Sequence, residues 1–435
     1  MIQIISEDDK QGQREFLAQL GRRSIGIDSD LLAVVGSILE DVRRRGDEAL
    51  IEYAKRFDGV ELTTSELRVS SQDLTDSAKR VDAKVLSALR EAIKNVRRFH
   101  EQQRELSSPL VNNEEIRLEQ RITPIESVGL YIPGGTAAYP SSVIMNVVPA
   151  QVAEVGRIVI TTPPQTVQKN PAVAAAFLEL GIDEIYAIGG AQAIAALAFG
   201  TQTVPKVDKI TGPGNKYVAA AKKLVFGVVG IDSIAGPSEV VVLADESARA
   251  DFIASDLLAQ AEHDEDASAV LITTSESLAR SVVAEVERQL SDLPRRSIVE
   301  RSLRNYGAIL IVSNLEHGVH LCNELAPEHL ELITKDNEGI SADIKHAGAI
   351  FVGEYSPEAL GDYFAGPNHV LPTGRTARFS SALGVYDFVK RTSILRYSPD
   401  EMMSAADKIA ELARAEGLEG HARSALVRKN KLHSE

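Results

Sequence analysis

The sequence is poor in cysteine and in basic residues. Cys322 is the only cysteine among 435 residues, so no disulfide can form within the chain, which favours a reducing compartment. Lysine and arginine number 47 against 62 aspartates and glutamates, which gives a net charge of −15. This deficit argues against nucleic acid or an anionic membrane surface as the main partner. An acidic protein can still bind an anionic cofactor through backbone amides.

Segments that direct a protein into or across a membrane are also lacking. Residues 1–9 contain neither the basic region nor the apolar run of a signal peptide. No uninterrupted apolar run is long enough to span a bilayer. We therefore expect a cytoplasmic protein that binds neither membranes nor nucleic acid.

The length of the chain exceeds one small core, so two or more domains are expected. Residues 31–57 carry apolar side chains at helical spacing, with Gly46 as a candidate interruption. Residues 73–106 are also expected to be helical, and residues 116–120 alternate as a strand does. From residue 128 onward, short apolar runs alternate with helical runs, which is typical of parallel sheets covered by helices.

This alternation assigns segments to strands and helices in turn. The expected strands span residues 157–161, 184–188, 240–244, 269–273, 308–313, 330–334 and 349–352. The expected helices span residues 172–180, 191–199, 216–224, 250–263 and 276–292, followed by a mainly helical tail over residues 399–432.

The helix expected over residues 250–263 ends with Gln260 and His263, and Asp251 or Ser247 could cap its start. Gln260 and His263 are three residues apart, so they lie on one face of a helix, where an amide oxygen and an imidazole nitrogen can converge on one ion. Imidazole suits zinc, and oxygen ligands are compatible with it. The alternative is an ordinary polar helix end, with a histidine near the negative pole of the helix dipole.

Glycines lie at three junctions where an expected strand gives way to a helix, namely Gly134-Gly135, Gly189-Gly190 and Gly212-Pro213-Gly214. Such turns place backbone N–H groups at the start of a helix, where a phosphate can bind. The dinucleotide-binding fingerprint would require a glycine where Tyr217 stands. An ordinary Rossmann motif is therefore absent, and tight turns without a ligand are an equally good interpretation.

The adjacent residues Glu328 and His329 offer two proton acceptors at nearly one place. Neighbours on a strand point to opposite faces, so a joint role requires a loop or bend, which Pro327 favours. Two adjacent polar residues more often lie on a surface without a shared role. A second, loop-like stretch contains Asp362, which could complete a metal site, and His369, which is either a ligand or a structural hydrogen-bond donor.

His317 and His320 are also three residues apart in a helical segment. Glu316 and Glu324 lie nearby and favour a solvated face. Cys322 belongs to the same segment and is expected to be a packed structural thiol, because a catalytic thiol needs an electropositive, open setting.

Ten stretches that run over nearly the whole chain carry a resemblance to a known family. They are residues 56–59, 129–135, 189–194, 212–218, 236–240, 260–263, 326–330, 361–363, 368–373 and 416–421. Together, in this order, they closely resemble histidinol dehydrogenases, and ten motifs in register are far more specific than any one of them. The acidic residues 264–266 depart from the family pattern.

The resemblance implies two incomplete Rossmann-like parallel-sheet domains, similar to those of aldehyde dehydrogenases, with small N-terminal and helical C-terminal extensions. The implied parts are residues 1–23, an N-terminal extension; 24–130 with 241–381, an α/β domain carrying zinc and the catalytic residues; 131–240, an NAD-binding α/β domain; and 382–435, a helical tail that reaches the partner subunit.

The resemblance also implies a reaction, the last step of histidine biosynthesis. L-histidinol would be oxidised to L-histidinaldehyde and then to L-histidine, with two NAD⁺ and one zinc ion per subunit. The implied zinc ligands, which also lie close to substrate, are Gln260, His263, Asp362 and His421. The implied further substrate contacts are Ser238, His329 and Glu416, the implied NAD contacts are Tyr131, Gln192 and Asn215, and the implied proton-accepting pair is Glu328 and His329. In the family the tail comes from the other subunit of a homodimer, so Glu416 and His421 would serve the partner's site.

Other classes of protein remain open. A zinc hydrolase would use the same ligands with an open position for water and Glu328 as base, but it would not need the glycine junctions. A thiol-dependent aldehyde dehydrogenase would need Cys322 as its nucleophile. A zinc-stabilised scaffold without activity would leave Glu328 and His329 without a role.

Overall fold

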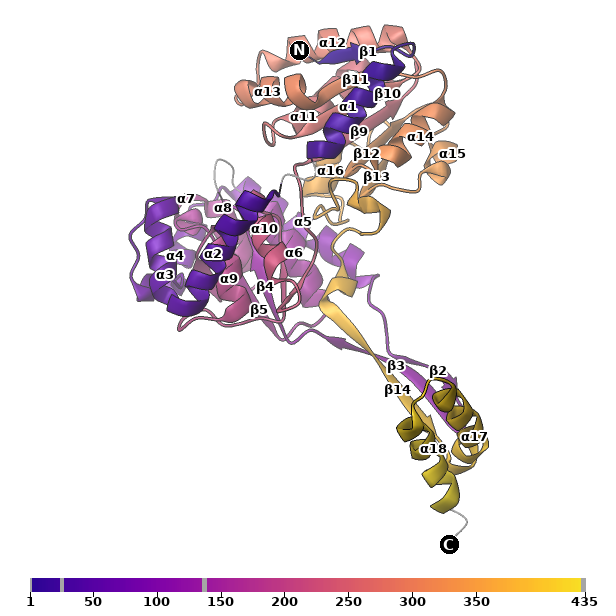
Figure 1. The fold of residues 1–435 in the computed structure, drawn as a ribbon. Coiled ribbons are helices and arrows are strands. Elements are labelled where there is room, and N and C mark those ends of the chain that lie inside the picture. The colour runs from indigo at the N-terminus through magenta and orange to yellow at the C-terminus, as the bar shows by residue number, and fades with distance from the viewer. Residues whose placement is uncertain (1, 24–26, 135–138, 432–435) are drawn as a thin grey trace. The chain divides into compact units, whose positions relative to one another are not determined.

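The computed structural model describes residues 2–23, 27–134 and 139–431. The chain divides into two compact units, the first made of Met1–Gln103 and Ile125–Phe388, the second of Arg104–Pro124 and Val389–Glu435. Figure 1 shows the helices and strands of each unit. Among the described residues, no helix combines the length and the apolar character needed to cross a membrane.

The six-stranded sheet of the first unit is entirely parallel. Its strands, in spatial order, are β1 (Gln3–Ile5), β11 (Gly307–Ile311), β10 (Ser268–Thr273), β9 (Glu239–Ala244), β12 (His329–Ile333) and β13 (Ala349–Val352). Alternate strand residues point to opposite faces, and an apolar cluster fills each face. One face packs against α11 (Ala250–Ala261), α12 (Glu276–Leu290) and α13 (Arg296–Tyr306), the other against α1 (Lys10–Arg23) and α14 (Leu315–Leu325). Near the end of this part of the chain lie α15 (Asn337–Asp343) and α16 (Glu358–Tyr363).

A second parallel sheet of five strands belongs to the same unit. Its strands, in spatial order, are β6 (Ile185–Ala187), β5 (Arg157–Thr162), β4 (Ser127–Tyr131), β7 (Lys209–Thr211) and β8 (Gly230–Ile231). Its intervening helices are α6 (Pro140–Val152), α7 (Thr166–Lys169), α8 (Pro171–Glu179), α9 (Gly190–Phe199) and α10 (Lys216–Val225).

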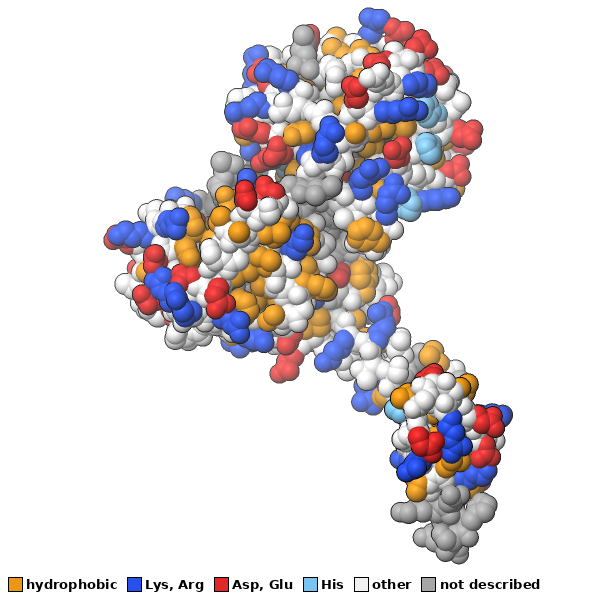
Figure 2. Space-filling model, viewed as in Figure 1, with side chains coloured by type: hydrophobic (Ala, Val, Ile, Leu, Met, Phe, Trp, Pro, Cys, Tyr) orange, Lys and Arg blue, Asp and Glu red, His pale blue; other side chains and the backbone are white. Residues whose placement is uncertain are grey.

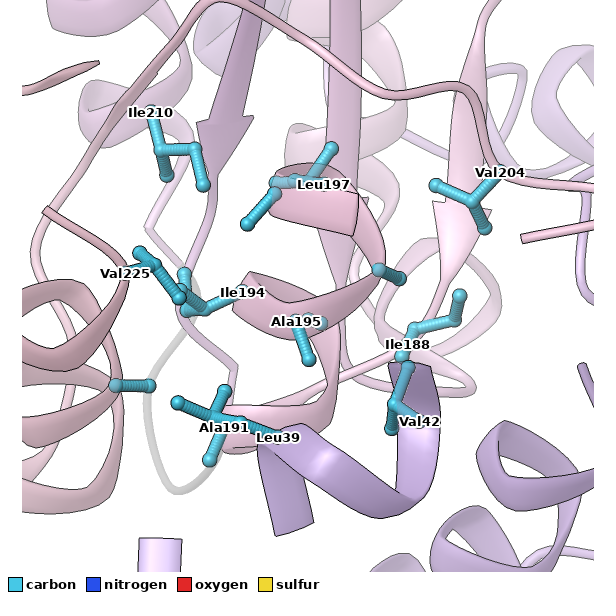
Figure 3. Close-up of a cluster of buried hydrophobic side chains, with 14 of the residues drawn as sticks. Leu39, Val42, Ile188, Ala191, Ile194, Ala195, Leu197, Val204, Ile210 and Val225 are labelled. Atoms are coloured by element: carbon cyan, nitrogen blue, oxygen red, sulfur yellow. The ribbon is translucent and has the colours of Figure 1, made fainter. Parts of the chain in front are cut away.

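Four helices from the first hundred residues pack beside this second sheet. They are α2 (Ser29–Arg45), α3 (Asp47–Tyr53), α4 (Ser71–Ala78) and α5 (Ala83–Glu101). Figure 3 shows Leu39 and Val42 of α2 in one buried cluster with Ile194 of α9 and Val225 of α10. Helix α4 contacts α8, and α5 contacts α6. The domain bounds expected from the sequence stay a prediction.

The second unit holds a small antiparallel sheet and two helices. They are β14 (Val389–Tyr397), β3 (Ile116–Pro124) and β2 (Ser108–Asn112), then α17 (Pro399–Ala415) and α18 (Glu419–Lys431). The two helices meet through the small buried side chains of Ala410, Ala413 and Ala422, which allow a close approach. The described part of the first unit also contains the short helical turns η1 (Ala54–Asp58), η2 (Thr64–Glu66), η3 (Thr376–Arg378) and η4 (Val385–Phe388).

The predicted fold class is confirmed: two parallel sheets covered by helices, with a helical C-terminal end. The suggested interruption at Gly46 is also confirmed, because this residue ends α2 with a φ of 59°, a conformation that favours glycine. The predicted caps of α11 are wrong. Arg249 occupies the N-cap position without a side-chain cap, the carboxylate of Asp251 binds the guanidinium of Arg249, and the hydroxyl of Ser247 donates to Asp245.

Candidate active site

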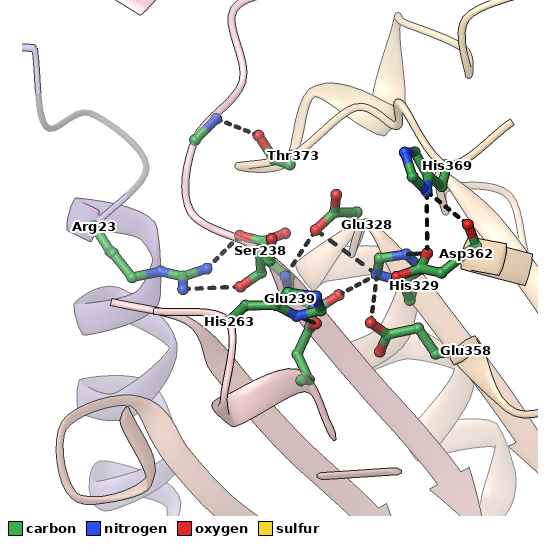
Figure 4. A network of polar contacts seen from close by, with 12 residues as sticks. Arg23, Ser238, Glu239, His263, Glu328, His329, Glu358, Asp362, His369 and Thr373 are labelled. Atoms are coloured by element: carbon green, nitrogen blue, oxygen red, sulfur yellow. Dashed lines mark hydrogen bonds and ion pairs between the residues drawn. The ribbon is translucent and has the colours of Figure 1, made fainter. Parts of the chain in front are cut away.

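Polar side chains gather where strands β9 and β12 of the first sheet begin (Figure 4). Strand β9 starts at Glu239, directly after Ser238, and β12 starts at His329, directly after Glu328. The two strands are adjacent and parallel, so their amino ends share one edge of the sheet. Parallel sheets more often bind ligands at the carboxyl ends of their strands, so this placement does not follow from the fold class alone.

Glu328 and His329 are both held by the backbone of Glu239. The N–H of Glu239 donates to Oε2 of Glu328 at 2.9 Å, and Nδ1 of His329 lies 3.0 Å from the carbonyl oxygen of Glu239. The chain bends at Glu328, after Ala326 has adopted a left-handed φ of 45°. The bend brings Oε2 of Glu328 to 3.7 Å from Nδ1 of His329, so the expected bend is present and the two neighbours meet.

The hydrogen bond of His329 to a carbonyl oxygen fixes its tautomer. A carbonyl oxygen only accepts, so Nδ1 carries a proton and Nε2 of the neutral ring keeps its lone pair. Nε2 is buried and makes no hydrogen bond within the described part of the chain. It lies 3.6 Å from Oδ1 of Asp362. The ring is therefore arranged to accept a proton at Nε2.

A group of three side chains beside this pair can hold a metal ion. His263, Glu358 and Asp362 each offer one ligand atom, and these atoms lie within 4.8 Å of one another. Glu358 and Asp362 are one turn apart on α16, whereas His263 directly follows the C-cap of α11. Oε1 of Gln260 lies 2.8 Å from Nδ1 of His263, which leaves Nε2 of that ring available.

The donor set fits zinc. Imidazole and carboxylate oxygens are its ordinary ligands, and a ligand histidine usually binds a second polar group through its other nitrogen. Four buried atoms at the site have no hydrogen-bond partner among the residues described: Nε2 of Gln260, Nε2 of His329, Oε2 of Glu331 and Oε2 of Glu358. Unpartnered buried polar atoms indicate a missing ligand or water.

Several residues of the site were not found from the sequence. Glu358 was missed, although its spacing of four residues from Asp362 on one helix was a usable signal. Glu331 and Asp256 were missed as well. Oε1 of Glu331 accepts the backbone N–H of Glu358 at 2.7 Å and so supports the start of α16. Burial raises the pKa of Asp256, which hydrogen-bonds to Glu331, to about 6.

Burial and charge set the protonation of the site. Burial raises the pKa of Glu328 to about 7 and that of Glu358 to about 8. Burial acts to lower the pKa of His329, but the carboxylates of Glu358, Glu328 and Asp362 outweigh it and hold that pKa well above its usual value. Burial acts to raise the pKa of Asp362, but the imidazole of His329 and the neighbouring histidines lower it. A bound cation would shift these equilibria toward ionised carboxylates and toward the neutral imidazole of His329, the form that can accept a proton.

His369 holds the turn after α16. Its Nδ1 lies 2.9 Å from the carbonyl oxygen of Asp362 and 3.9 Å from Oδ1 of the same residue. Burial lowers the pKa of His369. The backbone hydrogen bond supports the structural interpretation of this histidine.

The residues expected to bind NAD lie at the second sheet. Tyr131 ends β4, Gln192 is buried in α9, and Asn215 caps α10 by accepting the N–H of Tyr217 at 3.0 Å. The hydroxyl of Tyr131 accepts the N–H of Gly190 at 3.1 Å. They stand near the carboxyl ends of parallel strands, where such sheets commonly bind ligands. Their role as cofactor contacts stays a prediction.

Two of the junction glycines are needed by the backbone itself. Gly190 has a φ of 65° and Gly212 a φ of 114°, and a Cβ on Gly212 would collide with the carbonyl oxygen of Tyr131. Gly135 of the first junction lies outside the described residues. The turns are therefore tight for steric reasons, whether or not they also face a ligand.

The remaining predicted site residues lie apart from this group in the chain. Glu416 is the C-cap of α17 and His421 belongs to α18, both exposed in the second unit. Cys322 is 0% exposed on the buried side of α14, and burial raises the pKa of its thiol. A buried, protonated thiol is unsuited to act as a nucleophile, which disfavours the thiol-dependent alternative.

Comparisons with known proteins agree on one family. The profile described as histidinol dehydrogenase matches residues 22–429. The histidinol dehydrogenase of Geobacillus kaustophilus is 55% identical over 94% of this chain and 97% of its own length. That of Bacillus subtilis is 53% identical over 92% of this chain and 93% of its own. The crystal structure of histidinol dehydrogenase from Elizabethkingia anophelis superposes with a TM-score of 0.93 at 36% identity and covers 99% of both chains.

Proposed function

Because the chain belongs to the histidinol dehydrogenase family, we propose that it oxidises L-histidinol through L-histidinaldehyde to L-histidine, with two NAD⁺ as hydride acceptors, in the last step of histidine biosynthesis. The observation that carries the proposal is that the backbone of Glu239 holds both Glu328 and His329 beside the group of His263, Glu358 and Asp362.

One zinc ion per chain would be held by His263 and Asp362, by Gln260, and by His421 of the partner subunit. The unpartnered buried carboxylate oxygen of Glu358 supports a cation at this place. When bound, zinc supplies a fixed positive charge that can hold the imidazole and amine nitrogens of the substrate. Ser238 and Glu416 are the further substrate contacts of the proposal.

His329 serves the first oxidation. Its Nε2 is the free nitrogen of a ring whose other nitrogen is bound to a carbonyl, so it accepts the proton of the substrate alcohol. The nicotinamide, bound near Tyr131, Gln192 and Asn215, supplies the hydride acceptor. The neighbouring carboxylates stabilise the imidazolium that results.

Glu328 serves the second oxidation. Burial raises its pKa to about 7, close to the working range of a general base. Its ionised form takes a proton from the water that attacks the carbonyl carbon of L-histidinaldehyde. The hydrate that forms can then lose a second hydride to a second NAD⁺. One site thereby completes both oxidations with two neighbouring bases.

A homodimer with two shared sites accounts for the exposed residues of the second unit. Glu416 and His421 lie in solvent on α17 and α18. The same unit exposes Leu395 and Leu412, by 69% and 70%. Figure 2 shows hydrophobic side chains on the visible face of this unit. Exposed apolar side chains of this size are typical of a surface that another chain covers. In a symmetric dimer, each tail would complete the partner's site.

The direct test is to supply L-histidinol and NAD⁺ and to measure NADH and L-histidine together. We expect two NADH for each L-histidine formed. A hydrolase would turn over without NAD⁺, so activity that does not depend on NAD⁺ contradicts the proposal. Glu328→Gln and His329→Asn should both be strongly impaired, and full activity in both variants would contradict the roles assigned to the pair.

A further inference from the structure

Arg23, the last residue of α1, reaches into the site from the N-terminal segment. Its side chain is 3% exposed, and one terminal nitrogen lies 2.6 Å from the carboxylate of Glu239. The other terminal nitrogen donates to the carbonyl oxygen of Ser238 at 3.3 Å and to that of Asp266. Figure 4 shows the guanidinium facing the segment that begins β9. A guanidinium buried to this extent requires such partners.

Arg23 binds Glu239, and the backbone of Glu239 in turn binds both residues of the proton-accepting pair. The backbone N–H of Glu239 binds Glu328 at 2.9 Å, and its carbonyl oxygen binds His329 at 3.0 Å. The side chain of Glu239 points to Arg23, whereas its main chain points to the pair. Arg23 is thus connected to both bases through Glu239, and it contacts neither base directly.

We propose that Arg23 is a positioning residue for the oxidation: its guanidinium fixes Ser238 and Glu239, and through the backbone of Glu239 it fixes Glu328 and Nε2 of His329. The proposal rests on the proposed function of that pair. Both bases depend on the placement of one peptide segment, so a shift of that segment misplaces both together. A displacement of about 1 Å at a reacting group can reduce a rate by about 100-fold.

Arginine suits this place better than lysine does. Its planar fork donates in several directions at once, here to one carboxylate and two carbonyl oxygens. The carbonyl of Asp266 belongs to the loop after α11, the helix that leads to His263. Arg23 therefore ties the start of β9 to the segment that presents a candidate metal ligand. A lysine ammonium is a single point donor and would keep the ion pair without the other two contacts.

The test uses Arg23→Ala in the full-length enzyme, with Arg22→Ala as the matched control, because Arg22 is the adjacent, exposed arginine of the same helix. Steady-state kcat and KM are measured for L-histidinol and NAD⁺, together with zinc content and the thermal melting temperature. The kinetics of Arg23→Ala are repeated with methylguanidinium, which can occupy the space that the arginine side chain leaves, and with methylammonium at equal concentration.

We expect Arg23→Ala to lose at least about tenfold in kcat while each KM changes less than about threefold. Methylguanidinium should restore kcat several-fold, methylammonium should not, and Arg22→Ala should behave as wild type. A merely structural arginine would not give this split and this selective rescue. A folded, zinc-containing Arg23→Ala with a kcat within about twofold of wild type overturns the proposal, and so does a loss that methylguanidinium fails to relieve.

If Arg23→Ala does not fold, Arg23→Lys decides. A reduced kcat with unchanged KM values supports the positioning role, and any other result overturns it. Glu328→Gln and His329→Asn are assayed alongside. If both keep full activity, the proposed function of the pair fails; if both are impaired while the Arg23 variants are not, the positioning role alone fails.

Discussion

Replacing Glu328 with glutamine removes a proton acceptor and leaves the shape of the side chain nearly unchanged. The amide oxygen can accept the same N–H of Glu239 that now donates to Oε2 of Glu328 at 2.9 Å. The hydrogen bond of His329 to the carbonyl of Glu239 does not involve the carboxylate. The variant therefore reports the loss of the base rather than its displacement. A general base contributes about 10²- to 10⁴-fold to a rate, and we expect oxidation of supplied L-histidinaldehyde to fall by about that factor.

The measurement is a pair of single-turnover experiments with enzyme in excess, followed by NADH absorbance. One starts from L-histidinol and reports the first hydride transfer, and the other starts from L-histidinaldehyde. Glu328→Gln should be impaired mainly in the second, whereas His329→Asn should be impaired in alcohol oxidation as well. Equal losses of Glu328→Gln in both half-reactions would refute the division of labour between the two bases.

The same substitution should stabilise the metal-free protein above acidic pH. Burial raises the pKa of Glu328 from 4.5 to about 7 in the folded state, so the ionised form favours the unfolded chain. Below pH 4.5 the group is neutral in both states, and between pH 4.5 and about 7 the wild-type protein loses stability as the unfolded state ionises first. The pKa differs by about 2.5 between the two states, and one pKa unit corresponds to about 1.4 kcal/mol. The loss in free energy of unfolding therefore has an upper limit of about 3 kcal/mol.

Glutamine does not titrate. We therefore expect Glu328→Gln to exceed wild type by up to about 3 kcal/mol in free energy of unfolding near pH 8, and by only about 1 kcal/mol near pH 5. Urea unfolding in the presence of a chelator measures both. A difference that is the same at the two pH values would refute burial of the carboxylate as its cause.

Three further outcomes are expected. Chelation should abolish turnover and zinc should restore it. His263→Ala and Asp362→Ala should lower zinc content, and Glu358→Gln, which keeps an oxygen, should lower it less. A full zinc complement in Asp362→Ala contradicts the ligand set. When His263→Ala and His421→Ala chains, each inactive alone, are unfolded and refolded together, random pairing should return about one quarter of the sites to activity, and a pool no more active than its parents, beside a recovering wild-type control, would contradict shared sites. Cys322→Ser should keep full kcat, because that thiol is buried away from the site, and a large loss at normal stability would revive the thiol-dependent alternative.

The parts of the fold that sequence predicts are those with a local cause. The strand runs and the helices between them follow from apolar periodicity, and Gly46 ends α2 because its φ of 59° favours glycine. The i,i+3 spacing of Gln260 and His263 places them in contact, as their 2.8 Å hydrogen bond shows. A joint role of Glu328 and His329 requires a bend between them, and the neighbouring Pro327 favours such a bend. Each of these inferences needs only a few neighbouring residues.

The parts that sequence missed depend on residues far apart in the chain. Glu239 and Arg23 are separated by more than 200 residues, and nothing near either one signals a buried ion pair. From residue type alone, Glu331 and Asp256 would be predicted to lie on a solvated surface, because burial of an unpaired charge is strongly unfavourable. Their burial is possible only since the tertiary fold brings a partner to each. A cluster of this kind becomes visible only when the strands are set side by side.

The N-terminal segment illustrates the same difference. The family resemblance implies that residues 1–23 form an N-terminal extension. Strand β1 is three residues long, yet it pairs in parallel with β11 and closes one edge of the first sheet. Helix α1 packs Phe16 and Leu20 into the cluster beneath β9 and β10. This anchored helix ends in Arg23, which binds Glu239. A continuous series of contacts therefore leads from the pairing of β1 with β11 to the two bases, Glu328 and His329.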